Sequence, residues 1–334
     1  MVIEMTGLPK DESMTEEISR DLYKIEIPLP KSPLQALNSY VVKGPERNLV
    51  IDTGWNQQQC LDAMHAGLRE LGVEIEKTDF FITHIHADHL GLVSSLKTDD
   101  SKVYFNQPDA DRFKNPWRWD DFLKFAVLNG YPEAELQKTI EGHPALKFRA
   151  KEIPPFQIVN DGDRISIGDY GFTCVQTPGH TWGHMCLYES QKKILVSGDL
   201  ILNDITPNIQ LWSDEWDPLK QYLTSLERVN RLDIELVLPG HRSLFKDSRK
   251  RIRELKHHHQ IRLDEIVSIL RKGKKTAFEV ASQMSWDIVC DSWDLFPLSQ
   301  KWFATGEAIA HLKYLKEEGI IRREMLDHTI LFSI

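Results

Sequence analysis

A single six-residue run in this chain reads His-Ile-His-Ala-Asp-His, and it follows directly on the apolar segment 80–83. Such a segment is typical of a buried strand, which would deliver four potential metal ligands onto one short, rigidly based loop. Residues i and i+2 of an extended loop face the same way, so His84 and His86 can bind one cation while Asp88 and His89 turn towards a second. These ligand types suit zinc, with iron or manganese as alternatives.

Four ligands do not complete two metal sites, so further ligands must come from elsewhere in the chain. Three candidates stand in similar surroundings, because each follows a short apolar run and a glycine: His180, Asp199 and His241. This pattern is typical of a strand that ends in a tight turn, where the backbone can approach a ligand closely. The sequence therefore predicts a metal site gathered from several turns.

The motifs around these residues resemble those of the metallo-β-lactamase-fold hydrolases, in the glyoxalase-II, lactonase and nuclease branches. The matching pieces fall in the family's order; they are Ile-Asp-Thr-Gly at 51–54, the run 83–91, Thr-Pro-Gly-His-Thr at 177–181, Ser-Gly-Asp at 197–199 and Pro-Gly-His at 239–241. The resemblance implies an α/β (α+β) fold in which two sheets pack between helices as a four-layer αββα sandwich.

The same resemblance implies a site for two divalent metal ions, which we expect to be Zn²⁺, with Fe and Mn as alternatives. His84, His86 and His180 would bind the first metal, Asp88, His89 and His241 the second, and Asp199 would bridge the two. β-Lactamases proper usually place a cysteine near the second metal where this chain has an aspartate. Hydrolysis of antibiotics is therefore not expected.

Three residues have further candidate roles. Asp52 resembles the family's aspartate that orients ligand histidines by accepting their other ring proton; the alternative is an ordinary turn aspartate. His184 is a candidate for the same kind of support or for contact with substrate, and otherwise a structural histidine. Asp88 could accept a proton from a water shared by the metals, or serve as a ligand alone.

Two cations bridged by a carboxylate can lower the pKa of a shared water towards neutrality, so hydroxide is available without a Ser-His-Asp triad. We therefore expect a dinuclear metal-dependent hydrolase of a small ester, thioester or lactone, similar to the hydroxyacylglutathione hydrolases. The alternatives are a phosphodiesterase or endoribonuclease of the same fold and a non-enzymatic, metal-binding scaffold protein. The expected partner is a small-molecule substrate.

Length and patterning predict the domain organisation. With 334 residues, 41% of them hydrophobic, the chain can bury a large core. We expect a loosely packed leader at 1–21, a catalytic domain at 22–247 and a C-terminal domain at 248–334. The sequence has no apolar stretch long enough to span a membrane, so we expect no membrane partner and a cytoplasmic location.

Local patterns predict the first elements of the catalytic domain. Strands are expected at about 24–27, 39–42 and 48–51, and a helix at about 57–71 that Gly72 can end. A helical insertion at 109–155 is longer than a connection needs and would form a lid. Its aromatic residues, together with three tryptophans near the metal-bearing turns, would either contact an apolar part of the substrate or pack as inner helix faces: Phe113, Trp117, Trp119, Phe122, Phe125 and Tyr131, with Trp182, Trp212 and Trp216.

The C-terminal region differs from the rest of the chain in charge. Residues 246–275 contain 11 Lys and Arg against 4 Asp and Glu, whereas the whole chain has a net charge of −9. A long helix at 248–271, a helical stripe at 307–319 and a closing pair of short strands resemble a winged-helix appendage. Such a domain could bind nucleic acid, close the active site or pair two subunits as a homodimer; nucleic acid is the less favoured partner, since basic runs are more often solvated helix faces.

Overall fold

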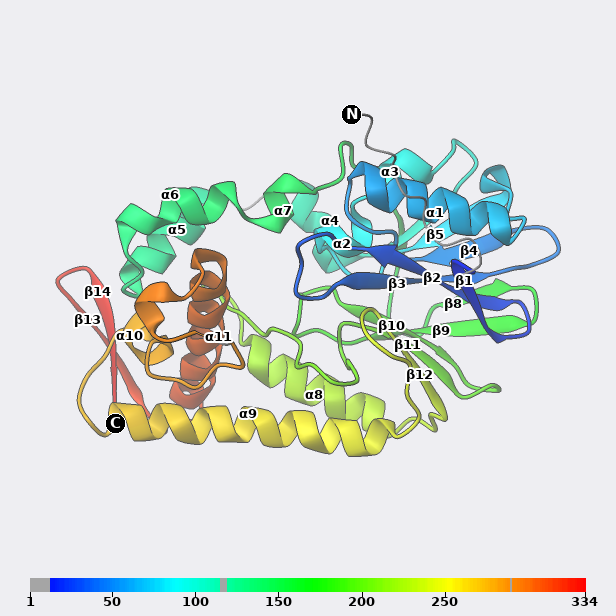
Figure 1. The fold of residues 1–334 in the computed structure, drawn as a ribbon. Coiled ribbons are helices and arrows are strands. Elements are labelled where there is room, and N and C mark those ends of the chain that lie inside the picture. The colour runs from blue at the N-terminus through cyan, green and yellow to red at the C-terminus, as the bar shows by residue number, and fades with distance from the viewer. Residues whose placement is uncertain (1–12, 115–118, 289) are drawn as a thin grey trace, which may run out of the picture.

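The computed structural model describes residues 13–114, 119–288 and 290–334, and two sheets stacked face to face form the part on the right of Figure 1. The first sheet has seven strands in sequence order: β1 Thr15–Ser19, β2 Leu22–Pro28, β3 Ala36–Val42, β4 Asn48–Ile51, β5 Thr78–Phe81, β6 Val103–Asn106 and β7 Gln157–Val159. The second has the order β12-β11-β10-β9-β8: β8 Arg164–Ile167, β9 Tyr170–Gln176, β10 Met185–Glu189, β11 Ile194–Gly198 and β12 Leu236–Pro239.

Helices cover the outer faces of both sheets (Figure 1). On the first sheet and in the insertion that follows β6 lie α1 Gln58–Glu70, α2 Ala87–Leu90, α3 Val93–Leu96, α4 Gln107–Lys114, α5 Trp119–Leu128, α6 Glu133–Glu141 and α7 Pro144–Lys147, with a short 3-10 turn at Ile75–Lys77. Under the second sheet lie α8 Pro218–Asn230 and α9 Ser248–Leu270.

Three separate clusters of buried apolar side chains match the three interfaces of a four-layer sandwich. One lies between α1 and the first sheet and contains Ile25 and Met64; a second lies between the sheets and contains Tyr40 and Phe172. The third packs the second sheet against α8, α9 and the C-terminal helices. The expected αββα architecture is confirmed, because each sheet buries both of its faces.

The early elements occur where the hydrophobic pattern predicts them. β2, β3 and β4 contain the three expected strands, and α1 ends one residue before Leu71, with Gly72 in the left-handed region at φ +64°. A loosely packed leader was expected at 1–21. Residues 15–19 differ from this expectation, because β1 pairs antiparallel with β2 and forms an ordered edge strand. Its pattern, Thr-Glu-Glu-Ile-Ser, has one apolar residue, so periodicity gave no signal for it. Residues 1–12 lie outside the described residues.

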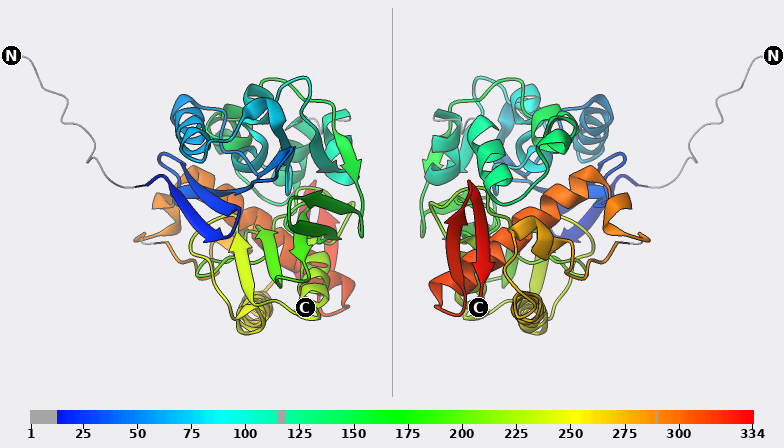
Figure 2. Two further views of the ribbon diagram at one scale, coloured as in Figure 1. Left: turned by 90° about the vertical axis from the view of Figure 1, so that its right-hand side faces the viewer. Right: turned by 90° about the vertical axis from the view of Figure 1, so that its left-hand side faces the viewer.

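The C-terminal region forms the winged-helix-like domain that the sequence predicts. It consists of α9, α10 Ala277–Ala281, a 3-10 turn at Trp293–Leu295, α11 Leu298–Glu317 and a hairpin of β13 Arg322–Leu326 and β14 Thr329–Ser333. Figure 2 shows this hairpin on the side of the molecule away from the two sheets. Within the described residues, no helix combines the length and apolar character needed to cross a membrane.

The candidate ligands all follow strands that end at one edge of the sandwich. β4 and β5 run parallel, and β11 and β12 also run parallel, so the residues after each pair emerge together. β9 has the same direction as β11, because both are antiparallel to β10. The two sheets are joined at this edge, where Met185 N donates to Thr83 O at 2.9 Å and Asn38 N donates to Gly240 O at 2.7 Å.

Candidate metal centre

The four turns bring all seven candidate ligands into one place. Their nitrogen and oxygen atoms form three overlapping groups, each with its atoms within 4.8 Å of one another: His84 with His86 and His180; His84 with His89 and Asp199; and Asp88 with His89 and His241. The residues come from the ends of β5, β9, β11 and β12. Segments up to 157 positions apart in the chain, from His84 to His241, therefore contribute to one centre.

The first group contains three histidine nitrogens. His86 Nδ1 lies 3.0 Å from His84 Nε2 and 2.9 Å from His180 Nε2. Burial lowers the pKa of all three rings, that of His86 to about 3. The rings are thus neutral at physiological pH, which is the form of imidazole that binds a metal.

The second group combines histidines with carboxylates at distances longer than hydrogen bonds. His241 Nε2 lies 3.4 Å from Asp88 Oδ2 and 3.6 Å from Asp199 Oδ2, and His89 Nε2 lies 3.6 Å from Asp199 Oδ1. Two ligands at about 2.1 Å from one tetrahedral zinc ion lie about 3.4 Å apart. These spacings therefore fit shared coordination of a cation.

Three buried atoms at the centre are left without a hydrogen-bond partner among the described residues. They are His89 Nε2, His241 Nε2 and Asp199 Oδ1. An unpaired buried polar atom costs about 1–3 kcal/mol, and three of them converging on one place are not expected without a ligand. Bound cations would satisfy all three, so the residues present fit a metal centre.

The charges of the centre also call for a cation. Burial lowers the pKa of His241, but the neighbouring Asp199 carboxylate outweighs it and raises that pKa to about 10. The pKa of His89 is raised in the same way, by Asp52 and Asp199 against burial. Burial raises the pKa of Asp88, but the neighbouring His241 and His89 rings lower it to about 2. The carboxylates thus attract positive charge, which a divalent cation would supply in place of protons.

Four of the five histidines in the ligand set have their other ring nitrogen held by an oxygen atom. This fixes the ring so that the free nitrogen points to the centre. The contacts are His84 Nδ1 with Thr83 Oγ1 at 3.0 Å, His89 Nδ1 with Asp52 Oδ2 at 2.8 Å, His180 Nδ1 with Asn208 O at 2.9 Å and His241 Nδ1 with Ala36 O at 2.7 Å.

Asp52 lies at the end of β4 and contacts both His89 and the strand that carries the histidine run. Its carboxylate accepts hydrogen bonds from Thr83 N at 2.8 Å and from Thr83 Oγ1 at 2.9 Å. Its backbone is in the left-handed region at φ +60°, a conformation that costs energy for a residue with a side chain. Asp52 therefore holds the ring of the candidate ligand His89, and its role in orienting a metal ligand stays a prediction.

His184 supports the turn that carries Asp199. Its Nε2 accepts a hydrogen bond from Asp199 N at 3.1 Å, and its Nδ1 lies 2.8 Å from Thr177 Oγ1. The ring is fully buried, so contact with a substrate, one of the two candidate roles, does not fit this position.

Asp109 is a buried residue of the centre that the sequence motifs did not identify. Its Oδ2 accepts from Ile85 N at 3.0 Å and from Thr181 Oγ1 at 2.8 Å, and its Oδ1 accepts from Gly183 N at 2.9 Å. It therefore ties the turn after β5 to the turn after β9. The only sequence signal was an aspartate in the first turn of a helix, α4, which is common in proteins.

Gly240 lies where the backbone comes so close to two candidate ligands that there is no room for a side chain. A Cβ on Gly240 would lie 2.6 Å from Asp199 Oδ1 and 2.8 Å from His89 Cε1. A side chain here would displace two of the candidate ligands. A glycine precedes each of the candidate ligands His180, Asp199 and His241 in the sequence. At Gly240 the reason for it is steric.

The most accessible part of the centre is the side of His86, Asp88 and His180. These three residues are partly exposed, whereas His84, His89 and His241 are fully buried and Asp199 is nearly so. A substrate therefore has access from the side of His86, Asp88 and His180. Trp182 is near this side, since it follows His180 by two positions; its ring lies 5.1 Å from that of Trp216 and under the guanidinium of Arg112.

The aromatic residues of the insertion mostly pack against the rest of the molecule. Phe113 contacts Phe105 of β6 and Phe156, which precedes β7, while Phe122 and Phe125 pack on the cluster shared with the C-terminal domain. Tyr131 is buried against Phe278 and Trp302. Of the two interpretations of these residues, the packed helix faces fit these positions. Trp117 lies outside the described residues.

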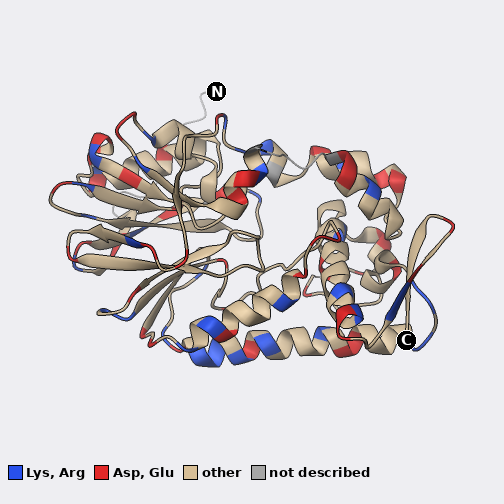
Figure 3. Ribbon diagram, turned by 180° about the vertical axis from the view of Figure 1, so that it is seen from behind, with Lys and Arg blue, Asp and Glu red and all other residues tan. Residues whose placement is uncertain are grey.

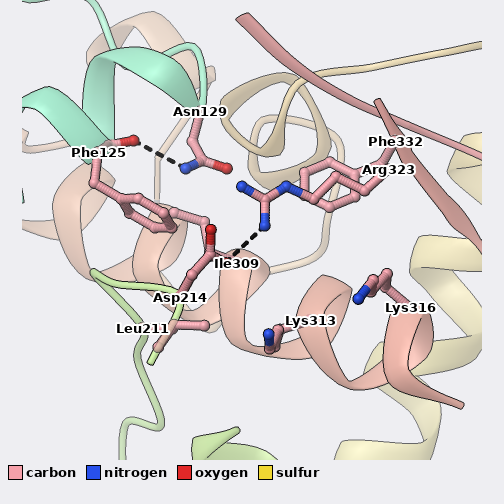
Figure 4. Close-up of a pocket in the computed structure, with 9 residues that line it drawn as sticks. All are labelled: Phe125, Asn129, Leu211, Asp214, Ile309, Lys313, Lys316, Arg323 and Phe332. Carbon is pink, nitrogen blue, oxygen red and sulfur yellow. Dashed lines mark hydrogen bonds and ion pairs between the residues drawn. The ribbon is translucent and has the colours of Figure 1, made fainter. Parts of the chain in front are cut away.

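A second hollow lies between α5, α11 and the hairpin and contains none of the metal-binding groups (Figure 4). Three cations line it, but each has an acidic partner. Arg323 Nη1 lies 2.6 Å from Asp214 Oδ1, and Lys313 and Lys316 each lie 3.0 Å from Glu317 Oε1. We assign no anion site to this hollow.

Comparison with known proteins identifies the class. The sequence profile described as "Metallo-beta-lactamase superfamily" matches residues 34–241, and the profile "Metallo-beta-lactamase-like, C-terminal domain" matches residues 263–333. The first match alone covers more than half of the chain. The chain therefore belongs to the metallo-β-lactamase superfamily, as a metallo-hydrolase with histidine and aspartate metal-binding groups.

Individual proteins of the superfamily are similar over most of the chain. The human protein named acyl-coenzyme A thioesterase MBLAC2 is 30% identical over 215 residues, which cover 62% of this chain and 74% of that protein. The probable metallo-hydrolase YqjP of Bacillus subtilis (strain 168) is 25% identical over 331 residues, covering 94% of this chain and 98% of that one. The crystal structure of a metallo-beta-lactamase family protein from Thermus thermophilus aligns with a TM-score of 0.79 at 29% identity, covering 95% and 99% of the two chains.

Proposed function

We propose that this protein is a dinuclear metal-dependent hydrolase that acts on a small ester, thioester or lactone. The observation that carries the proposal is the set of three buried, unpaired ligand atoms, His89 Nε2, His241 Nε2 and Asp199 Oδ1, surrounded by ligands at coordination spacing. His86, Asp88 and His180 are partly exposed, so a substrate can reach the centre from their side. An open side is what a hydrolase requires.

The proposed ligand assignment follows the groups of neighbouring atoms. His84, His86 and His180 would hold one cation, Asp88, His89 and His241 would hold the other, and Asp199 would contribute to both. Nitrogen and carboxylate ligands without a thiolate suit Zn²⁺, and also Fe or Mn. We propose Zn²⁺, because it accepts low coordination numbers and leaves a position for substrate.

When bound, two divalent cations supply a water of lowered pKa as nucleophile and polarise the attacked carbonyl. The chain itself orients the ligand rings through Asp52 and Asn208 and keeps water out of the buried side. Asp88 is the carboxylate on the open side and is ionised, so it is the group placed to accept a proton from the attacking water. Asp52 is buried and engaged with Thr83 and His89, so it holds the ring and stays out of proton transfer.

A small acyl substrate is favoured over nucleic acid by the charges of the C-terminal domain. Figure 3 shows Lys and Arg along α9 interspersed with Asp and Glu. Many cations of α9 and of the segment after it are already paired: Arg251 with Glu254 at 3.1 Å, Lys250 with Glu254 at 3.8 Å, Arg262 with Glu265 at 3.5 Å, Lys274 with Glu324 at 2.6 Å, and Lys256 with Glu227. Paired cations release fewer counterions from a phosphate backbone. The name of the human relative adds support for a thioester.

A phosphodiesterase or ribonuclease is the second candidate, supported by the winged-helix-like domain and the net positive charge of α9. The two candidates differ in the bond that is cleaved. A single panel of thioesters, lactones and single-stranded RNA, offered to the purified full-length protein, separates them. We expect turnover of an acyl substrate and none of RNA.

The variant Asp199→Ala provides the blank for this panel. Loss of the bridging ligand should lower hydrolysis by more than about 100-fold, which exceeds the usual cost of losing a residue that merely orients a ligand. Asp62→Ala, an exposed aspartate on α1, is the matched control and should retain full activity. Cleavage of RNA alone, or equal activity in Asp199→Ala, would overturn the proposal.

A further inference from the structure

The loop between β11 and α8 does more for the metal centre than carry Asp199. It has no helix or strand between Asp199 and Asp217, and its residue Asn208 holds the ring of His180 through a backbone carbonyl. A long loop without regular structure keeps one conformation only when other elements hold it, because ordering each residue costs about 1–2 kcal/mol. The position of His180 therefore depends on what holds this loop.

Elements of the C-terminal domain hold the loop. Arg251 of α9 donates from Nε to Leu202 O at 2.7 Å and from Nη2 to Ile205 O at 2.8 Å. Further along the loop, the ring of Trp212 stacks on that of Trp302 of α11, with 3.7 Å between centroids. Both contacts join the loop to helices that follow it by more than thirty positions in the sequence.

A helix of the same domain reaches Asn208 itself. The side-chain Nδ2 of Asn208 donates to Glu307 Oε2 of α11 at 3.1 Å. Glu307 is 7% exposed, and its other oxygen lies 3.9 Å from Arg262 Nε. Burial raises the pKa of Glu307 to about 7, and in either protonation state an oxygen of this buried group can accept from Asn208 and hold the loop. Two contacts in succession therefore connect α11 to His180: Glu307 accepts from the side chain of Asn208, and the backbone carbonyl of Asn208 contacts the His180 ring.

We propose that Glu307 is a positioning residue of the metal centre: through Asn208 it fixes the ring of His180 from the C-terminal helix α11. The inference rests on the proposed function, because it concerns the affinity of that centre for a cation. A ligand ring that is already oriented loses less freedom when the cation binds, and the affinity is higher for that reason. The C-terminal domain is then part of the metal centre.

Stepwise binding of Zn²⁺ to the metal-free, full-length protein tests this inference. The two binding constants are measured by competition with a chromophoric chelator in the wild type, in Glu307→Leu, in Asn208→Ala and in the double variant. We expect one constant, that of the cation held by His180, to weaken about tenfold in each single variant while the other stays unchanged. The double variant should be no weaker than either single variant, because all three break one connection.

Two further variants separate positioning from general destabilisation. Glu307→Gln keeps an oxygen that can accept from Asn208 and should restore an affinity near that of the wild type. Leu315→Ala removes a buried side chain of the same helix, about 12 Å further along its axis. It should lower the free energy of unfolding and leave both Zn²⁺ constants unchanged.

The outcomes that overturn the inference differ from those that overturn the proposed function. Wild-type affinity in both Glu307→Leu and Asn208→Ala, or effects that add in the double variant, would refute the role of Glu307. If Glu307→Leu does not fold, Asn208→Ala, whose side chain is partly exposed, decides the matter. A wild-type protein that binds no transition metal would refute the metal centre and this inference together.

Discussion

The carboxylate of Asp109 joins two of the turns on which the candidate ligands lie. It is fully buried and accepts hydrogen bonds from Ile85 N, Thr181 Oγ1 and Gly183 N. Burial raises its pKa, while these donors favour the ionised form. A carboxylate that accepts three bonds from two turns fixes their separation, and with it the distance between His86 and His180.

The variant Asp109→Asn should disturb this link without changing the size of the side chain. In either orientation, the amide NH₂ would face a backbone N–H, of Ile85 or of Gly183, so one buried donor loses its acceptor. We expect the free energy of unfolding to fall by about 1–3 kcal/mol and turnover by about tenfold. Urea unfolding and a hydrolysis assay measure the two effects. Asp111→Asn, an exposed neighbour on α4, is the control; equal behaviour of the two variants would contradict this role.

The candidate ligands could be picked out from the sequence because they lie in short motifs beside apolar runs. Their spacing and residue types carry the chemical signal within a few positions. Asp109 and Asn208 carry no such signal. Their roles come from contacts between segments far apart in the chain, and in Asn208 the contacting atom is a backbone carbonyl, which every residue has.

At the scale of elements, a pair of buried histidines joins α9 to α11. His259 Nδ1 lies 3.0 Å from His311 Nε2, and His311 Nδ1 donates to Glu307 O at 2.8 Å. His311 therefore accepts from His259 in its neutral form, and a second proton would break that contact. Burial lowers the pKa of His311 to about 4, and Arg262 adds to this effect.

This pair predicts a loss of stability in mild acid. Below a pH of about 6.5 the unfolded chain binds a proton at His311 that the folded chain does not bind until about pH 4, so folding is disfavoured as pH falls through this window. The contribution of this ring reaches about 3 kcal/mol. Unfolding in urea at several pH values should show a shallower decline for His311→Gln than for the wild type. Parallel curves would contradict the prediction.

The elements themselves were predictable to different degrees. Those with one buried face, such as α1 and α9, follow their helical spacing. α11 begins at Leu298, earlier than the stripe at 307–319 indicates, because its first turns are buried on several sides and show no single apolar stripe. Thr276 precedes α10 with a complete capping box, a signal that local sequence can carry.

At the scale of the whole molecule, the insertion and the C-terminal domain pack together and against the metal-bearing loop. Tyr131 of the insertion contacts Trp302 of α11, which in turn stacks on Trp212. Gly130 allows this approach, since a Cβ there would lie 2.5 Å from Thr276 Oγ1. Hydrophobic patterning predicted the two parts separately. It could not predict that they meet, because their contacts join residues more than 140 positions apart, such as Gly130 and Thr276.

For the molecule as a whole, we propose that seven side chains from four turns hold two cations and so create the nucleophile for hydrolysis. The most direct measurement is the transition-metal content of the purified full-length protein, compared with its hydrolytic activity before and after removal of metal by a chelator. The account predicts about two equivalents of metal per chain, loss of activity on removal and its return when Zn²⁺ is added back. Protein that is free of metal and still fully active would contradict it.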